Sequence, residues 1–268
     1  MKKEIIRSVW TDGVPYYLTC YVPFHVKENG TPTVFIHPGG TCLADDYGWI
    51  AGPMCRRGYL VYCLHQRGYG SGEPGINDYG GYGQQRDLLE AIQFVKRQKY
   101  VDLDRFIGIG HSSGAHMIQR LAVDEDFTCC IALSQESDWI EYTKSCKYFL
   151  KDYYQKAMQR YGGDPDEHPD EYLLRSCIQL ADKIKVPVLA ITGSMDNITP
   201  PQQAREMTKA LNDAGNIRSE FVLIEGAGHF FEKFGFSGEY RSDVAEIIMS
   251  WIDTIFEDKV ISCYENAK

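Results

Sequence analysis

The 268-residue chain lacks the features that mark a membrane protein or a nucleic-acid-binding protein. No stretch approaches the roughly 20 apolar residues that a membrane-spanning helix needs, and the first eight residues have no apolar region of the signal-peptide kind. No basic cluster with interleaved aromatic residues is present, and 37 acidic side chains outnumber 28 basic ones, for a formal charge of −9. An acidic surface repels nucleic acid and anionic lipid. We therefore expect a cytoplasmic protein that binds neither nucleic acid nor membrane.

The sequence also contains no Cys-x-x-Cys pair, no internal repeat and no low-complexity tract, although it has nine cysteines. Most of these cysteines, such as Cys63 and Cys129, stand within apolar segments. A thiolate zinc site or a redox pair is therefore poorly supported. We interpret the cysteines as reduced thiols that pack as small hydrophobic side chains, and we predict no metal site.

Strand and helix patterns alternate from about residue 30 onward, which is typical of an α/β protein with a mostly parallel sheet and helices on both faces. Apolar runs predict strands at residues 33–36, 59–64, 106–109, 128–133, 187–191 and 220–224. Upstream, two strand patterns flank Asp12-Gly13, and this hairpin signal predicts an antiparallel pair at the sheet edge. The last helix is expected from about Ser242 to Phe256. We expect a single domain over residues 1–268.

The segment from Glu136 to about Asp182 interrupts this alternation, because it is too long for a single crossover helix. It is rich in aromatic residues: Trp139, Tyr142, Tyr148, Phe149, Tyr153, Tyr154, Tyr161 and Tyr172. Insertions at the carboxyl edge of a parallel sheet lie over the crevice where ligands bind. We interpret residues 136–182 as a small helical cap and expect Trp139 and Tyr142 to bind substrate. The alternative is a surface excursion with no role in binding.

The most specific motif is the run from Phe106 to Ala115, in which an apolar strand leads into Gly-x-Ser-x-Gly and a helical pattern follows. A serine at the tip of such a turn is strained and crowded, so only glycine at positions 110 and 114 avoids a clash of its Cβ. The turn presents the Ser112 hydroxyl at a helix N-terminus, where backbone N–H groups stabilise an oxyanion. Ser112 is the predicted nucleophile.

A serine hydroxyl needs a neighbouring base, and the base needs a carboxylate that orients it. When such a serine stands on a strand-to-helix turn, the acid and then the histidine come later in the chain, on loops after later strands. Asp196 follows the second-to-last predicted strand, and His229 follows the last one. We therefore predict a triad of Ser112, His229 and Asp196. Glu136, just after an earlier strand, is the competing candidate for the acid.

The charge of a tetrahedral intermediate requires two converging N–H donors. One is predicted to be the amide of Ser113, and the other to come from the loop His37-Pro38-Gly39-Gly40 after a buried strand. Proline has no N–H, so the second donor is Gly39 or Gly40. His111, next to the nucleophile, is expected to have a structural role and to border the substrate-binding site.

Taken together, these segments resemble an α/β-hydrolase, and within that superfamily the chain is similar to the catalytic domain of the prolyl oligopeptidase family. The similarity begins at about residue 15. It rests on Arg67-Gly68-Tyr69-Gly70, the Gly110–Gly114 turn, Ser137-Asp138-Trp139, the segment 184–203 and Gly228-His229. The resemblance implies an eight-stranded sheet and cleavage of esters or amides through an acyl-enzyme without a cofactor.

Two departures from that family direct the functional prediction. We expect no N-terminal propeller, because fewer than 30 residues precede the predicted α/β segments, and Pro38 stands where several members have a tyrosine donor. The segment His37-Pro38-Gly39-Gly40 resembles the His-Gly-Gly-Gly motif of esterases more than the motif of that family. The prediction is a serine carboxylesterase for small apolar or aromatic substrates. The alternatives are a peptidase or aryl amidase acting on short peptides or amides, and a non-catalytic binding module. The predicted partner is a small-molecule substrate, and a homo-oligomer is compatible with the sequence.

Overall fold

The computed structural model describes residues 1–40, 42–68, 78–233 and 240–265, with side chains up to residue 257. The strands are β1 (Lys2–Val9), β2 (Pro15–Val22), β3 (Thr31–His37), β4 (Leu60–His65), β5 (Val101–His111), β6 (Cys129–Leu133), β7 (Val188–Gly193) and β8 (Glu220–Ile224). The helices are η1 (Ala44–Tyr47), α1 (Gly48–Arg56), α2 (Tyr82–Lys96), α3 (Ser113–Leu121), α4 (Trp139–Phe149), α5 (Lys151–Tyr161), α6 (Pro169–Leu173), η2 (Ile178–Leu180), α7 (Pro201–Asp213) and α8 (Arg241–Glu265).

All eight of these strands form one sheet, in the order β1-β2-β4-β3-β5-β6-β7-β8. β1 and β2 form the predicted antiparallel hairpin at one edge, and β2 is also antiparallel to β4. All other neighbouring strands in the sheet are parallel. The order and directions are those of the α/β-hydrolase fold that the sequence predicted.

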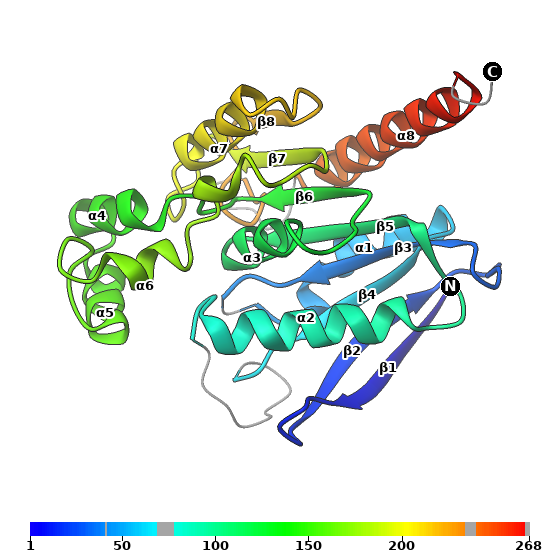
Figure 1. Cartoon of the computed structure of the whole chain (residues 1–268), viewed down its shortest axis with the longest axis horizontal. Coiled ribbons are helices and arrows are strands. Elements are labelled where there is room, and N and C mark those ends of the chain that lie inside the picture. Colours follow the sequence, from blue (N-terminus) through cyan, green and yellow to red (C-terminus); the bar gives the residue numbers. More distant parts are fainter. Residues whose placement is uncertain (41, 69–77, 234–239, 266–268) are drawn as a thin grey trace.

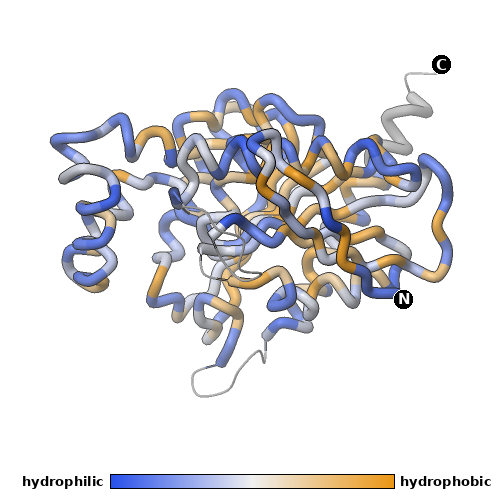
Figure 2. The backbone as a smooth tube through the Cα atoms, turned by 90° about the horizontal axis from the view of Figure 1, so that it is seen from below, coloured by the Kyte–Doolittle hydropathy of each residue, from blue (hydrophilic) through white to orange (hydrophobic). Residues whose placement is uncertain are grey.

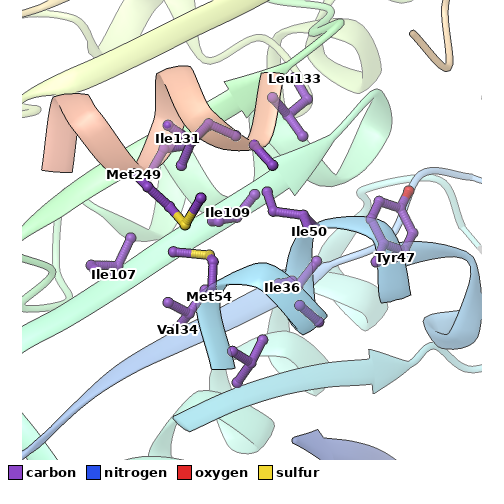
Figure 3. Packing of buried hydrophobic residues seen from close by; sticks show 14 of the residues in the cluster. Val34, Ile36, Tyr47, Ile50, Met54, Ile107, Ile109, Ile131, Leu133 and Met249 are labelled. Carbon is purple, nitrogen blue, oxygen red and sulfur yellow. The ribbon is translucent and has the colours of Figure 1, made fainter. Parts of the chain in front are cut away.

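The parallel strands are apolar on both sides, so alternate residues enter two separate cores. Val34 of β3 faces α1 and α8, whereas its neighbour Phe35 faces α2 and α3. Figure 3 shows Met54 of α1 and Met249 of α8 packed together over the first of these faces. The sheet is therefore covered on both sides, which explains why its strands read as continuous hydrophobic runs.

Hydrophobic segments gather in the middle of the molecule and hydrophilic ones follow its outline (Figure 2). The eight cysteines in the described part of the chain are all buried, as expected for thiols that pack like small hydrophobic groups. Among the described residues, no helix is both long enough and apolar enough to cross a membrane.

The insertion between β6 and β7 forms α4, α5, α6 and η2. The parallel strands run toward α4, α5 and α6, which lie together beyond the carboxyl edge of the sheet (Figure 1). The predicted end of the last helix was wrong, because α8 continues to Glu265 and its end projects away from the sheet (Figure 1). Tyr69 and Gly70 of the motif after β4 lie outside the described residues.

Candidate active site

Ser112 lies in the turn between β5 and α3, where its φ of 52° and ψ of −125° are unusual for a residue with a side chain. A Cβ at Gly110 would lie 2.3 Å from the carbonyl oxygen of Gly114, and one at Gly114 would lie 2.4 Å from that of His37. The two glycines therefore let β5, α3 and the loop after β3 approach one another, as the sequence predicted. The turn presents Ser112 to a cavity at the sheet edge.

Asp196 and His229 meet on the loops that follow β7 and β8. The Nδ1 atom of His229 lies 2.9 Å from Oδ2 and 3.0 Å from Oδ1 of Asp196, and both side chains are buried. Asp196 Oδ1 also accepts the N–H groups of Ile198 at 2.9 Å and Thr199 at 2.8 Å. A carboxylate only accepts hydrogen bonds, so Nδ1 carries the proton and Nε2 keeps its lone pair. The structure thus places Asp196, and not Glu136, against the imidazole.

A chain of hydrogen bonds holds the backbone of His229. Its carbonyl oxygen accepts from Ser134 Oγ and from His111 Nε2, both at 3.0 Å. His111 Nδ1 lies 2.8 Å from the hydroxyl of Tyr47, and that hydroxyl oxygen accepts the N–H of Gly39 at 2.8 Å. Burial lowers the pKa of His111 to about 3, so this imidazole is neutral. These hydrogen bonds connect the loop after β3 with the loop that carries His229.

This contact with Tyr47 concerns the expected oxyanion hole, for which the loop after β3 offers Gly39 or Gly40. The N–H of Gly39, one of the predicted donors, is already engaged by the tyrosine hydroxyl. Ser113 is the first residue of α3, and an N–H at that position has no acceptor within the helix. Gly40 lies beside it, since a Cβ at Gly40 would be 3.4 Å from Ser113 Oγ. Ser113 and Gly40 are therefore the candidate donors that we carry into the proposal below.

The hydroxyl of Ser112 points to a carboxyl group. Among the hydrogen bonds of the described residues, Ser112 Oγ donates to Glu136 Oε1 at 3.1 Å and not to His229. Burial raises the pKa of Glu136 to about 7. Ser112, Glu136 and His229 line the same cavity. The competing acid of the sequence prediction therefore belongs to the site, but it contacts the nucleophile and not the base.

The cavity around Ser112 has a volume of about 180 Å³ and an aromatic wall. Trp139 and Tyr142 of α4, which the sequence predicted, line it together with Tyr153 of α5. A second cavity of about 580 Å³ adjoins it, and both are lined by His111 and Phe230. Sequence reasoning did not single out Phe230, although it directly follows the predicted base.

The base of the aromatic wall is attached to α7. The side-chain oxygen of Gln203 accepts the N–H groups of Ser137 and Asp138, both at 2.9 Å. Ser137 Oγ donates to the carbonyl oxygen of Gln203 at 2.6 Å, and Asp138 Oδ1 accepts the N–H groups of Ile140 and Glu141 in the first turn of α4. The start of α4 is therefore held both by its N-cap and by a neighbouring helix.

No group of three or more His, Cys, Asp or Glu side chains in the described part of the chain is placed to hold a metal ion. The site itself contains a hydroxyl on a tight turn and an imidazole oriented by a carboxylate.

A serine on a strand-to-helix turn, beside an Asp–His pair on loops after later strands of this sheet, defines a serine hydrolase of the α/β-hydrolase class. Residues 45–259 match the family described as the prolyl oligopeptidase family. The chain belongs to that family.

Two curated relatives illustrate the similarity. The chain is 25% identical to the uncharacterized peptidase YuxL of Bacillus subtilis (strain 168) over 209 residues, which cover 75% of this chain and 30% of that protein. It is 24% identical to the acylamino-acid-releasing enzyme of Rattus norvegicus over 253 residues, covering 85% of this chain and 32% of the enzyme. The chain thus spans about a third of the length of these relatives.

Solved structures show the same fold. A putative dipeptidyl aminopeptidase IV from Bacteroides ovatus has a TM-score of 0.73 at 22% identity, with 94% of this chain and 36% of that chain covered. The acylaminoacyl peptidase of Pyrococcus horikoshii also has a TM-score of 0.73, at 17% identity, with 94% of this chain and 41% of that chain covered.

Proposed function

We propose that this protein is a serine peptidase or amidase that hydrolyses amide bonds of short peptides or related small amides. The observation that carries the proposal is the buried Asp196–His229 pair, whose imidazole lines one cavity with the strained Ser112. YuxL and the Pyrococcus horikoshii enzyme are described as peptidases, and this supports amide cleavage over the carboxylesterase activity that the sequence alone favoured. Ester cleavage remains an expected side activity, because esters use the same acyl-enzyme chemistry.

The mechanism follows from the positions of the side chains. The Ser112 hydroxyl leaves Glu136, gives its proton to His229 Nε2 and attacks the carbonyl carbon. The N–H groups of Ser113 and Gly40 stabilise the oxyanion. His229 then donates the proton to the leaving amine, and a water molecule repeats the sequence on the acyl-enzyme. Asp196 keeps the imidazole in the required tautomer and stabilises its protonated form.

The two adjoining cavities offer room for the two parts of a substrate. The smaller cavity contains Ser112 and the aromatic wall, and we assign it to the acyl group. The larger cavity is reached past His111 and Phe230, and we assign it to the leaving group. On this assignment the scissile bond lies where the cavities meet.

The test compares p-nitroanilides with p-nitrophenyl esters of the same acyl groups, after fluorophosphonate labelling of the protein. We expect labelling of the wild type, loss of labelling in Ser112→Ala, and turnover of anilides. Ser250→Ala, an exposed serine on α8, is the matched control and should label normally. Turnover of esters alone would favour the carboxylesterase, and a protein that is neither labelled nor active would be the binding module.

A further inference from the structure

Glu136 is a buried acid at the cavity whose carboxyl group the mechanism does not use. Its side chain follows β6 and is only 4% exposed. One oxygen, Oε1, accepts from Ser112 Oγ at 3.1 Å and from Thr199 Oγ1 at 3.3 Å. The other oxygen, Oε2, is buried without a hydrogen-bond partner among the described residues. Leaving such an oxygen unsatisfied is costly, so a donor from outside the chain would stabilise it.

The walls next to this carboxyl are aromatic. The ring centroids of Trp139 and Tyr142 are 5.9 Å apart, and those of Tyr142 and Tyr153 are 5.7 Å apart. Aromatic faces attract cations, and the attraction is strongest where water is excluded. No lysine or arginine is among the described residues that line this cavity. A carboxyl group and three rings therefore border a space that no lysine or arginine among the described residues lines.

We propose that Glu136 and the aromatic wall of Trp139, Tyr142 and Tyr153 form a subsite for a primary ammonium group carried by the acyl part of the substrate. The inference rests on the proposed function, because the acyl group that Ser112 attacks is what places the ammonium group. Ion pairing would satisfy Oε2, and the rings would bind the remaining charge and the alkyl stem.

The distances restrict where the ammonium group sits on the acyl chain. Glu136 Oε1 is 3.1 Å from the attacking oxygen, so an ammonium group bound to this carboxyl lies only a few bonds from the scissile carbonyl. The cavity of about 180 Å³ also admits only a short chain. Two sources of the same chemistry fit: the free α-amino group of an aminoacyl substrate, and the terminal amino group of a short ω-amino acyl chain.

Matched pairs of p-nitroanilides test the subsite, each pair replacing the ammonium group by a methyl group of similar size. The α-amino pair is alanyl and 2-methylpropanoyl, and the ω-amino pair is 4-aminobutanoyl and pentanoyl. We expect the wild type to prefer the ammonium member of at least one pair by about tenfold or more in kcat/KM. In Glu136→Gln the preference should fall close to one. The ratio within each variant cancels any general loss of activity. Glu141→Gln, an exposed acid on α4, is the matched control and should keep the preference.

A second measurement needs neither turnover nor the variant. Propylammonium should slow fluorophosphonate labelling of wild-type Ser112, whereas 1-propanol at the same concentration should not. Equal kcat/KM within both pairs, a preference that survives in Glu136→Gln, or equal effects of the amine and the alcohol would each overturn the subsite. Failure of the proposed function looks different, because Ser112 of the wild type would then not be labelled at all.

Discussion

The hydroxyl of Tyr47 lies 2.8 Å from Nδ1 of His111, and the same oxygen accepts the N–H of Gly39. Through this one side chain, the loop that supplies the proposed oxyanion donor is connected to the residue that holds the His229 carbonyl. Tyr47 is therefore a positioning residue, although it does not line the cavity around Ser112.

Tyr47→Phe removes the acceptor of the Gly39 N–H and the partner of His111 without changing the ring. We expect kcat to fall about tenfold, equivalent to about 1.4 kcal/mol, with a smaller change in KM, because alignment of catalytic groups matters most in the transition state. Steady-state kinetics on a p-nitroanilide measures the changes in kcat and KM separately. Tyr82→Phe, at a tyrosine that is 77% exposed, is the control and should leave both constants near wild type. A Tyr47→Phe protein with unchanged kcat would contradict the positioning role.

Asp196→Asn should reduce kcat by about 10³-fold or more, because an amide no longer stabilises the protonated imidazole or holds the correct tautomer. Steady-state kinetics measures the loss, and thermal melting checks that the fold is intact. Asp213→Asn, at an exposed ion pair of α7, serves as the control. If Glu136→Gln lost more activity than Asp196→Asn on an uncharged acyl substrate, the assignment of the acid would be wrong.

The buried carboxyl of Glu136 should make the stability of the wild type fall as the pH rises from about 5 to about 8. Its pKa in the folded protein is about 7, above the ordinary value of 4.5, so in this window the folded state holds a proton that the unfolded chain has released. The stability that this proton contributes is fully present below the pKa of Glu136 in the unfolded chain. It is lost as the pH rises through the pKa of Glu136 in the folded protein. The loss amounts to about 3 kcal/mol.

Urea unfolding gives the free energy of unfolding of the wild type and of Glu136→Gln at both ends of this pH window. The difference between the two proteins should change by the amount of that loss. Several titratable groups face Glu136: His229 and Asp196 from the loops after β8 and β7, and Tyr142 and Tyr153 from α4 and α5. Both proteins carry these groups, so their own titration largely cancels. A difference that does not grow with pH would show that Glu136 is not held protonated by burial.

Gly114→Ala should lower the free energy of unfolding by about 3 kcal/mol, because the new Cβ would meet the backbone oxygens of His37 and Pro38, which cannot move aside cheaply. Gly30→Ala is the matched control. Gly30 lies just before β3, where a Cβ would meet only Lys27 Cβ at 3.4 Å and the Glu28 carbonyl oxygen at 3.6 Å, which are ordinary contacts. Alanine there should change the free energy of unfolding by less than about 1 kcal/mol. Thermal and urea unfolding of both variants test the contrast.

The sheet and the contact between Asp196 and His229 could be predicted because both follow from local sequence patterns. Each parallel strand is an apolar run with turn residues after it, and strand order then places the residues that follow each run at one edge of the sheet. The glycines around Ser112 could be predicted for a similar reason, since the close approach of neighbouring backbone is a property of the turn itself.

Other parts of the site depend on contacts between distant parts of the chain. The sequence could not choose between Gly39 and Gly40, because each carries an N–H, and the contact that engages the Gly39 N–H comes from Tyr47 on another element. The hydrogen bond from Ser112 to Glu136 joins residues that are 24 positions apart in the sequence, and no local pattern predicts the direction of either side chain. The sequence identified Glu136 as a candidate acid but not the group that it contacts.

Gln203 is not among the residues that line the cavity around Ser112, yet its amide oxygen fixes where α4 begins. The width of the acyl cavity is consequently decided in part by how α7 packs on the sheet. Substitutions along α7 that displace this glutamine would alter which acyl groups are accepted while leaving every lining residue unchanged. Selectivity in this protein is therefore expected to depend on α7 as well, a helix with no residue among those that line this cavity.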